Sequence, residues 1–548
     1  MCTRLVFFLP FFLLLGFCFG QQKPSFDFDK LDIIASADVP QDAPGIATGI
    51  IFEGKQIYTK YAGFRDLEER QDINEETRFN IASMAKQFTA LAILMLEKEG
   101  KLKLEDDFRI YLPEIYSKVS HKITLKHLLS HSSGIRDVYA LWSLKGIVWW
   151  KETLRNEDAL KILSDQETLN FNPGEHFEYS NSNYILLAEV IEKVAEDGFY
   201  SFTDDMFAKL GMKGTSFTRD YTKINGPIAK PYFNFDEWQG YEWTCDIVGD
   251  GNLFSTLEDQ LQWERIIQTG GNDWVNSSVI NKSQLLFDSI DHREYGFGLQ
   301  HGIYNDIPYK YHEGATGAWK SITVRFPQED LSIVTLTNSG KVIPTYQTML
   351  MVNEIFNIKD SKPTFPIQPD KEGDFIEIQE LMGNYITPEG YFVRLIDKEG
   401  DLYLLRSNRN DTKLIRENAN TTQQWNDKAF KQQFKKNEQG EMEVTFYYPS
   451  VPPFTLTKID FEADSLDKSL LGKEYINREL GVALKIDMEK TGGLSVILGE
   501  NTMDAIALSN TRIKAGNYML EIDKTKDGKT SILLNTDRLD QVIFSSNE

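Results

Sequence analysis

The hydrophobic and polar positions change their spacing along the chain, and the first change lies at the amino terminus. Arg4 is the positive charge of the first residues, and fifteen apolar residues interrupted by one proline follow, from Leu5 to Phe19. This pattern predicts a cleaved signal peptide over residues 1–20. An uncleaved anchor is the weaker alternative, because a helix needs about 20 apolar residues to span a bilayer. A lipoprotein signal at Cys18 is a second alternative, which the bulky Phe17 disfavours.

Two later segments have the spacing of helices. Residues 83–99 are apolar on almost every side until the charged Glu97–Glu99, and Gly100 follows. This predicts a buried central helix. A second, amphipathic helix is predicted over Ile185–Val194. The longest apolar run after the signal peptide, Ala90–Leu96, is too short to cross a membrane.

A proline-rich segment separates two kinds of pattern. Three prolines between Pro363 and Pro369 predict a linker over residues 361–372, after a domain of mixed helices and strands over residues 26–360. Beyond it, short alternating runs between glycine-containing turns predict antiparallel strands. The segment Leu381–Ile386 recurs loosely as Leu470–Ile476, which favours two diverged β domains, at residues 373–460 and 466–548. One larger β domain is the alternative.

Composition narrows the class of protein. The chain has 548 residues, of which 41% are hydrophobic and 26% charged, as in globular proteins. Its net charge of -23 repels phosphates and anionic lipid, so we expect no nucleic-acid partner. Two of the three cysteines lie in the signal peptide and leave Cys245 alone, which excludes an internal disulfide framework in the mature protein.

Ser83 and Lys86 are the first candidate catalytic residues. They stand at positions i and i+3 at the start of the predicted central helix, so they share one helix face near free backbone N–H groups. A serine hydroxyl becomes a nucleophile when a base takes its proton, and burial favours the neutral amine of a lysine that does so. The spacing therefore indicates acyl transfer. The alternative is that Ser83 only caps the helix, since serine is a favoured N-cap.

Two further clusters follow along the chain. Tyr179 and Asn181 lie on a predicted loop just before the helix at Ile185–Val194, where a phenol can relay a proton and a carboxamide can hold a substrate amide. His312 and Gly314 lie on a glycine-containing strand, and glycine lets a ligand approach the backbone closely. His312 can donate a hydrogen bond to the substrate or to the Tyr179 oxygen.

The ordered set Ser83-x-x-Lys86, Tyr179-x-Asn181 and His312-x-Gly314 resembles the three motifs of the penicillin-recognising serine hydrolases. These include class C β-lactamases, D,D-peptidases, D-aminopeptidases and related esterases, of the peptidase family S12 type. The surrounding sequence is similar to that family as well, over residues 30 to 355. The resemblance implies an α/β sandwich of the β-lactamase/transpeptidase type, with helices flanking an antiparallel sheet, and a barrel-like all-β region at the carboxyl end.

The resemblance also implies roles for these residues. Ser83 would be the acylated nucleophile, and Lys86 and Tyr179 the general base pair. Asn181 would bind substrate, and the backbone N–H groups of Ser83 and Ala315 would form the oxyanion hole. With His312 and Gly314, these complete the predicted site.

Two departures from the family pattern bear on the substrate. His312 stands where most β-lactamases have lysine, and Glu313 follows it, so a β-lactam carboxylate loses a fixed positive partner at neutral pH. We therefore expect an exported, periplasmic or secreted serine hydrolase for small peptide, amide or ester substrates, with D-amino-acid peptides or esters favoured over efficient β-lactam hydrolysis. The alternative is an inactive ligand-binding protein of this fold, with the β region as its interaction module.

Other catalytic motifs are absent from the sequence. No Gly-x-Ser-x-Gly motif of an α/β-hydrolase occurs. His127 and His131 have the spacing of a zinc motif, but Leu128 replaces its glutamate, so we expect them to pack or hydrogen-bond at a helix end. We predict no metal and no cofactor.

Overall fold

The computed structural model describes residues 23–235, 237–287, 294–358, 376–388, 390–406, 411–425, 427–448, 451–459, 466–488, 493–524 and 529–546. The predicted signal peptide at 1–20 and the predicted linker at 361–372 lie outside these residues. Among the described residues, no helix has both the length and the apolar character needed to cross a membrane.

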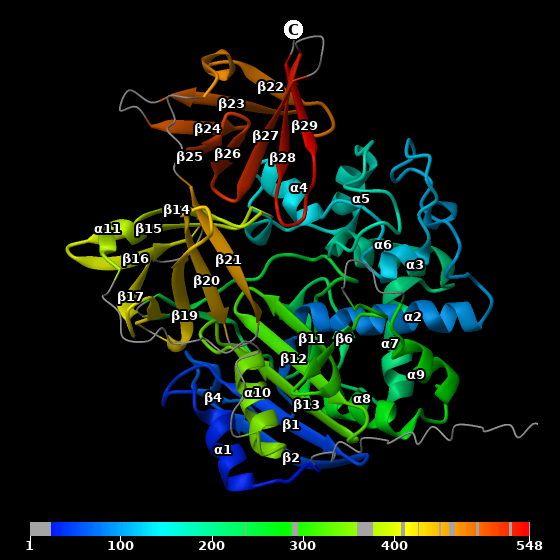
Figure 1. Cartoon of the computed structure of the whole chain (residues 1–548). Helices are drawn as coiled ribbons and strands as arrows, with labels where there is room; N and C mark the ends of the chain where they lie inside the picture. Colours follow the sequence, from blue (N-terminus) through cyan, green and yellow to red (C-terminus); the bar gives the residue numbers. More distant parts are fainter. Residues whose placement is uncertain are drawn as a thin grey trace, which may run out of the picture.

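A six-stranded antiparallel sheet forms the centre of the first domain, in the order β10-β11-β12-β13-β1-β2 (Figure 1). Its strands are β10 (Gln300–Tyr304), β11 (Ile307–Thr316), β12 (Trp319–Phe326), β13 (Leu331–Thr337), β1 (Ile46–Phe52) and β2 (Lys55–Ala62). The strands β1, β12 and β13 are buried along almost their whole length. Both faces of the sheet are therefore covered.

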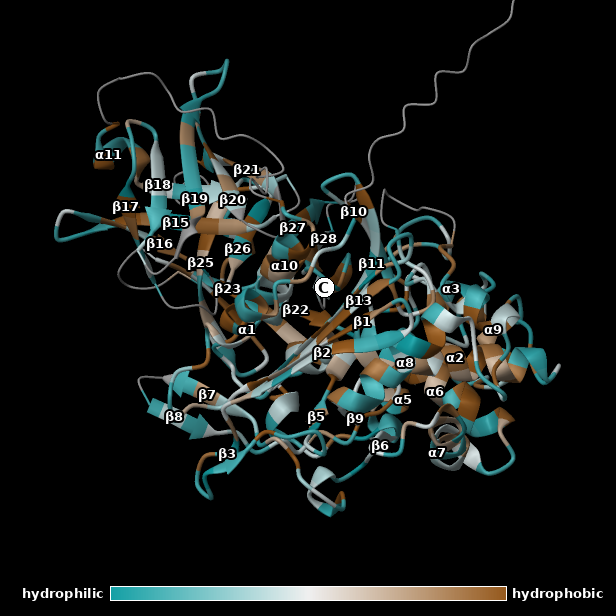
Figure 2. Cartoon of the chain, turned by 90° about the horizontal axis from the view of Figure 1, so that it is seen from below, coloured by the Kyte–Doolittle hydropathy of each residue, from teal (hydrophilic) through white to brown (hydrophobic). Residues whose placement is uncertain are grey.

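Helices pack on the two faces. On one face lie α1 (Phe28–Ser36) and α10 (Pro344–Ile355), and on the other lies α8 (Leu257–Thr269). Ile50 packs into a core with α1 and α10, whereas its neighbour Ile51 packs into the larger core that contains α8, as the alternation of a strand requires. Figure 2 shows hydrophobic residues concentrated along β1, β13 and α2 (Lys86–Lys98).

A helical region extends the larger core around α2. Its α-helices are α3 (Leu125–Leu129), α4 (Val138–Leu144), α5 (Asn156–Ser164), α6 (Asn181–Val194), α7 (Gly198–Leu210) and α9 (Ser277–Ser283), with the 3-10 turns η1 (Ala82–Ala85), η2 (Phe108–Ile110), η3 (Trp149–Lys151) and η4 (Tyr221–Lys223). Short strands complete the domain: β3 (Phe64–Asp66), β4 (Gln71–Asp72), β5 (Arg78–Asn80), β6 (Ser216–Phe217), β7 (Tyr232–Phe235), β8 (Glu237–Gly240) and β9 (Leu253–Thr256).

Two closed eight-stranded barrels follow. The first contains the short helix α11 (Ile378–Leu381) and the strands β14 (Gly383–Ile386), β15 (Phe392–Lys398), β16 (Asp401–Leu405), β17 (Thr412–Arg416), β18 (Thr421–Gln424), β19 (Asp427–Lys436), β20 (Met442–Tyr448) and β21 (Val451–Ile459). The second contains η6 (Lys468–Leu470) and the strands β22 (Glu474–Asn477), β23 (Val482–Met488), β24 (Leu494–Leu498), β25 (Asn501–Ser509), β26 (Arg512–Ala515), β27 (Tyr518–Lys524), β28 (Thr530–Asn535) and β29 (Val542–Ser546). The two similar sequence segments fall at β14 and β22, the first strand of each barrel.

The second barrel is joined to the first domain more closely than the first barrel is. Its interior residues belong to the same continuous hydrophobic core as α2 and α6, whereas the first barrel has a core of its own. Arg136 and Glu479 form an ion pair across this junction at 2.5 Å, with side chains only 2% and 15% exposed. Lys145 Nζ donates to the Leu480 carbonyl at 2.8 Å. In Figure 1 this barrel lies above α4.

The predicted fold class is confirmed, with an antiparallel sheet between helices and an all-β carboxyl region. Two local predictions need correction. The residues at Ser83 form the 3-10 turn η1, and the α-helix starts only at Lys86. Asn181 does not lie on a loop, because it is the first residue of α6.

Candidate active site

Ser83 lies on the tight turn η1, and the residue before it has an unusual backbone conformation. Ala82 has φ 47°, in the left-handed region, which costs an alanine about 1 kcal/mol. The Ala82 N–H donates to Asn80 Oδ1 at 2.9 Å, and Asn80 Nδ2 donates to Asn252 Oδ1 at 3.1 Å. These buried side chains hold the turn in place and present Ser83 at the start of α2.

Lys86 is completely buried, and its amine contacts the Ser83 hydroxyl. The Lys86 Nζ donates to Ser83 Oγ at 3.0 Å, to Asn181 Oδ1 at 3.0 Å and to the Asp250 carbonyl at 2.7 Å. No side-chain cap bond is present at η1 or at α2, so the alternative that Ser83 caps the helix does not describe this turn. Ser83 instead pairs with the lysine three residues later.

Asn181 is oriented from both sides of its carboxamide. Its Oδ1 accepts from Lys86, while its Nδ2 and its backbone N–H donate to Asp137 Oδ2 at 2.9 and 2.8 Å. Asp137 is fully buried and caps α4 through its other oxygen, which accepts from the Tyr139 and Ala140 N–H groups. The N-terminal ends of α4 and α6 are thereby tied together at the site.

Tyr179 lies between two buried groups of the site. The Lys86 Nζ is 5.0 Å from the centre of the Tyr179 ring, within the range of a cation–π contact. The His131 ring packs against Tyr179 with 4.3 Å between ring centres. His131 is buried, and its Nδ1 accepts from the Ser180 N–H at 3.2 Å. Burial, and then the charge of Lys86, lower the pKa of His131 well below its usual value, so it is neutral.

His312 is buried on β11, and both ring nitrogens have partners. Burial, and then the charge of Lys86, lower its pKa to about 3. Its Nδ1 lies 2.7 Å from the Glu313 carbonyl and therefore carries the proton, so Nε2 accepts from the Tyr295 hydroxyl at 3.1 Å. The expected hydrogen bond from His312 to the Tyr179 oxygen is thus replaced by one with Tyr295. The neutral ring provides no positive charge.

Gly314 lets β11 approach the nucleophile turn. A Cβ at this position would lie 2.2 Å from the Ile81 carbonyl oxygen and 2.4 Å from Ser321 Oγ. Ser321 Oγ itself donates to the Ile81 carbonyl at 2.8 Å. Only glycine allows this spacing, which brings Ala315 to the same cleft as Ser83.

All but one of the predicted site residues line one cleft, with a volume of about 480 Å³. The exception is Lys86, which is completely buried and donates to Ser83 and Asn181, two of the lining residues. The cleft has an aromatic wall that includes Tyr139, Trp149 and Trp243. Its other lining residues include Asp250 and, from the second barrel, Arg538.

The sequence reasoning missed the residues that orient the predicted ones. Asp137 and Arg538 belong to no recognised motif, and only tertiary packing brings them to the site, whereas Tyr295 begins a glycine-containing segment, residues 295–298, that resembles the family. Asp250 stands between two glycines that resembled the family, which is a weak signal that could have drawn attention to it. Its Oδ2 accepts from the Tyr139 hydroxyl at 3.1 Å.

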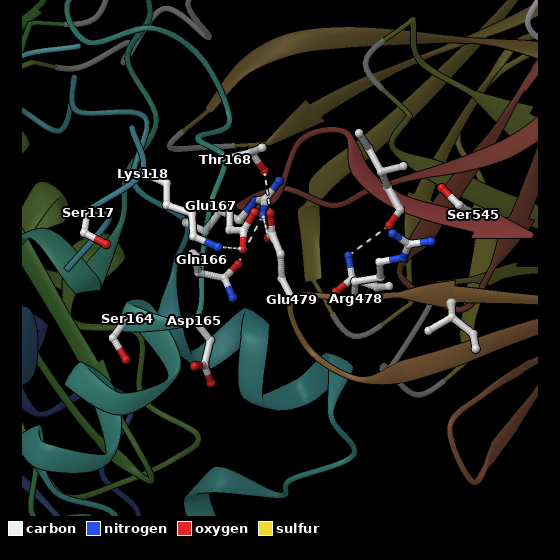
Figure 3. A pocket seen from close by; sticks show the side chains of 14 residues that line it. Ser117, Lys118, Ser164, Asp165, Gln166, Glu167, Thr168, Arg478, Glu479 and Ser545 are labelled. Atoms are coloured by element: carbon white, nitrogen blue, oxygen red, sulfur yellow. Dashed lines mark hydrogen bonds and ion pairs between the residues drawn. The ribbon is translucent and has the colours of Figure 1, made fainter. Parts of the chain in front are cut away.

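A larger cavity, of about 630 Å³, lies between the first domain and the second barrel (Figure 3). Most of its charged side chains form ion pairs: Glu479 with Arg136 across the junction, and Lys118 with Glu167 along the wall. The Thr168 hydroxyl also donates to Glu479. This cavity is therefore part of the junction between the domains.

The histidine pair forms no metal site. The His127 side chain takes part in the capping box of α3, and His131 packs under Tyr179, as expected of residues at a helix end. Across the ranges that the structure describes, no group of three or more His, Cys, Asp or Glu side chains is arranged to hold a metal ion.

A serine hydroxyl beside a buried lysine, in a cleft between an antiparallel sheet and helices, is the arrangement that an activated serine nucleophile needs. The chain belongs to the beta-lactamase family, whose family model matches residues 32–352, more than half of the sequence.

The sequence is similar to two named relatives over about the same region. The chain is 28% identical over 326 residues to a D-aminopeptidase of Cereibacter sphaeroides, covering 57% of this chain and 60% of that protein. It is also 28% identical over 328 residues to "Protein flp" of Staphylococcus aureus, covering 56% of this chain and 62% of that protein. The matched region thus spans about three fifths of these relatives.

Among solved structures, the octameric penicillin-binding protein homologue from Pyrococcus abyssi superposes with a TM-score of 0.58. The two sequences are 24% identical, and the match covers 79% of this chain and all of that one. This likeness supports the fold.

Proposed function

We propose that this protein is an exported serine hydrolase that works through an acyl-enzyme on Ser83. The contact between Lys86 Nζ and Ser83 Oγ, at 3.0 Å, carries the proposal, because it places a buried amine next to the hydroxyl it must deprotonate. The family membership supports the same class of chemistry.

Lys86 and Tyr179 are the proposed general base pair. The three acceptors around Lys86 Nζ match the three hydrogens of a charged lysine. Once Lys86 has passed one proton to solvent, the lone pair of its neutral amine can face Ser83 and take the hydroxyl proton. The Ser83 oxygen then bonds to the substrate carbonyl carbon, and the leaving nitrogen or oxygen receives a proton from the base pair as its bond breaks. Water, activated by the same pair, releases the acid product and regenerates Ser83.

The backbone N–H groups of Ser83 and Ala315 are the proposed oxyanion hole. Ser83 and Ala315 both line the cleft, where Gly314 allows β11 to approach the turn that carries Ser83, and this supports the assignment. Donors fixed in this way stabilise the negative oxygen of the tetrahedral intermediate without having to reorganise. Asn181 remains the proposed contact for a substrate amide. Its Nδ2 group has two hydrogens, of which one is donated to Asp137 and the other can be donated to the substrate.

We favour small peptides, amides and esters, including those of D-amino acids, as substrates. The neutral His312 does not supply the charge that a lysine gives at this position, and a relative in the same family is a D-aminopeptidase. The apolar segment at residues 5–19 supports export to the periplasm or the medium, with lipid attachment at Cys18 as the lesser alternative.

Substrate profiling tests this function. Purified protein is assayed with p-nitrophenyl esters, D-amino acid amides, D-Ala-D-Ala peptides and nitrocefin, beside the Ser83→Ala variant. We expect turnover of an ester or amide at a rate well above that of nitrocefin, and loss of that turnover in Ser83→Ala. Equal turnover by the parent and a folded Ser83→Ala protein would overturn the proposal, as would stoichiometric binding without product release.

A further inference from the structure

The loop between β28 and β29 of the second barrel places Arg538 in the catalytic cleft. Arg538 lines this cleft together with Ser83 and Asn181. Its Cζ atom lies 5.5 Å from the centre of the Tyr179 ring. The cleft is therefore built from two domains, although every motif residue comes from the first.

The loop that carries Arg538 is held from both domains. Within the loop, the Thr536 N–H donates to the Leu539 carbonyl at 2.8 Å, and the Arg538 N–H donates to Thr536 Oγ1 at 3.0 Å. Asn170 of the first domain binds the loop through two hydrogen bonds. Its Nδ2 donates to the Arg538 carbonyl at 3.3 Å, and its Oδ1 accepts from the Asp540 N–H at 3.1 Å. Such a loop is preorganised and loses little freedom when a ligand binds.

The Arg538 side chain keeps donors available for a ligand. It is 37% exposed, and within the described residues it makes one hydrogen bond, from Nη1 to Asp137 Oδ2 at 3.4 Å. Asp537, 3.8 Å from Nε, is 88% exposed and is screened by water. A guanidinium has five N–H donors, so most of them remain unused.

The other charged groups of the cleft do not replace this cation. Lys86 donates to three acceptors, one of which is the Ser83 hydroxyl, and the His312 ring is neutral. Asp137 Oδ2 accepts two hydrogen bonds from Asn181 and forms an ion pair with Nη1 of Arg538, so this pair engages one nitrogen of the guanidinium. Asp250 is bonded to the Tyr139 hydroxyl.

We propose that Arg538 is a specificity-determining residue that binds a carboxylate group of the substrate. A guanidinium matches a carboxylate with two parallel hydrogen bonds, and a partly buried pair of this kind is stronger than one in water. The same charge repels an ammonium group, so among the proposed peptides, amides and esters this assignment favours those with a carboxylate over amides of free amino acids. This inference rests on the proposed function, because it assigns the substrate class of the same cleft: acyl compounds that carry a carboxylate near the scissile bond.

Matched esters test the preference. Three p-nitrophenyl esters share one chain length and end in a carboxylate, a methyl or an ammonium group: the hexanedioate monoester, the hexanoate and the ε-aminocaproate. A second pair, the hexanoyl esters of meta-hydroxybenzoate and of phenol, moves the carboxylate to the leaving group. We expect Arg538→Gln to lower kcat/KM at least about tenfold for the carboxylate ester of one series and to change the neutral esters less than about twofold.

Control variants separate recognition from structure. Arg538→Lys should keep part of the preference, and Arg512→Gln, a change on the same barrel at an ion pair with Glu521, should alter none of the esters. An equal loss on every ester, or no change on any, would overturn the proposal, because Arg538 would then act only on the structure or not at all.

A binding measurement distinguishes this failure from that of the proposed function. Dissociation constants of adipate and of its uncharged diamide, adipamide, are measured by calorimetry on Ser83→Ala, with and without Arg538→Gln. Adipate binding that weakens at least about fivefold in the double variant supports the role of Arg538 even if no ester is hydrolysed. An adipate dissociation constant that is the same with and without Arg538→Gln overturns the proposal even if the esters are hydrolysed through Ser83.

Discussion

Replacing Asp250 by asparagine should remove a pH-dependent loss of stability. Asp250 is 6% exposed, and its Oδ1 has no hydrogen-bond partner within the described residues. Burial raises the pKa of this carboxyl from 3.8 to about 6, against the opposing effect of the positive charge on Lys86. The carboxyl therefore binds its proton more tightly in the folded than in the unfolded protein.

The sign and size of the effect follow from this difference. Where the folded protein holds a proton that the unfolded chain has lost, stability falls as the pH rises, here between pH 3.8 and about 6. The rise in the pKa of Asp250 corresponds to roughly 3 kcal/mol in total, of which roughly 1 kcal/mol falls between pH 5 and pH 8. Asp250→Asn lacks this loss. Any constant cost of the new amide cancels when one variant is compared at two pH values.

Urea unfolding at pH 5 and pH 8, followed by tryptophan fluorescence at matched ionic strength, measures the effect. Trp149 and Trp243 line the same cleft and report on this domain. We expect the free energy of unfolding of Asp250→Asn, relative to the parent, to be roughly 1 kcal/mol higher at pH 8 than at pH 5. Asp273→Asn, at an exposed position, is the control. A relative stability of Asp250→Asn that is constant or falls with pH would refute the reasoning.

Two further predictions concern packing. Gly314→Ala places a methyl group 2.2 Å from a carbonyl oxygen of the nucleophile turn. We therefore expect the free energy of unfolding, measured by thermal unfolding, to fall by about 1–3 kcal/mol and kcat to fall as well. Gly240→Ala, whose nearest neighbour would be at 3.6 Å, should show neither effect, and equal behaviour of the two variants would contradict the account. Glu479→Gln leaves the buried Arg136 without its charged partner. We therefore expect the free energy of unfolding in urea to fall by about 3 kcal/mol and proteolysis between the first domain and the second barrel to become faster. Values equal to those of the parent would show that this ion pair does not hold the junction.

The part of the site that could be predicted consists of residues that are close together in the sequence. Ser83 and Lys86 are three residues apart on one turn, and Tyr179 and Asn181 are two apart at a helix start, so spacing alone places each pair. The alternating runs beyond the linker predict the antiparallel strands of the carboxyl region, whereas the sheet of the first domain and the barrel-like form are expected only from the family resemblance. The turn over Ala82–Ala85 is not predictable in this way: neither the left-handed φ of Ala82 nor the 3-10 geometry leaves a mark in the sequence, so the expected helix starts three residues too early.

The residues that sequence could not place act across long separations. Asp137 orients Asn181 from 44 positions away, and Arg538 contacts Asp137 across 401 positions. Arg538 lies in a polar turn between two strands, which resembles any hairpin turn of the barrels. His312 was recognised as part of a motif, but its partner Tyr295 and its neutral state depend on burial, which only the packed structure reveals.

The most direct test of the central claim locates the nucleophile. The protein is treated with an aryl fluorophosphonate, and intact-mass and peptide mass spectrometry identify the labelled residue in the parent, Ser83→Ala, Lys86→Met and the exposed control Ser164→Ala. We predict one adduct, on Ser83, in the parent and in Ser164→Ala, none in Ser83→Ala, and labelling at least about 100-fold slower in Lys86→Met. Labelling of Ser83→Ala at the rate of the parent, or an adduct on another residue, would contradict the acyl-enzyme mechanism.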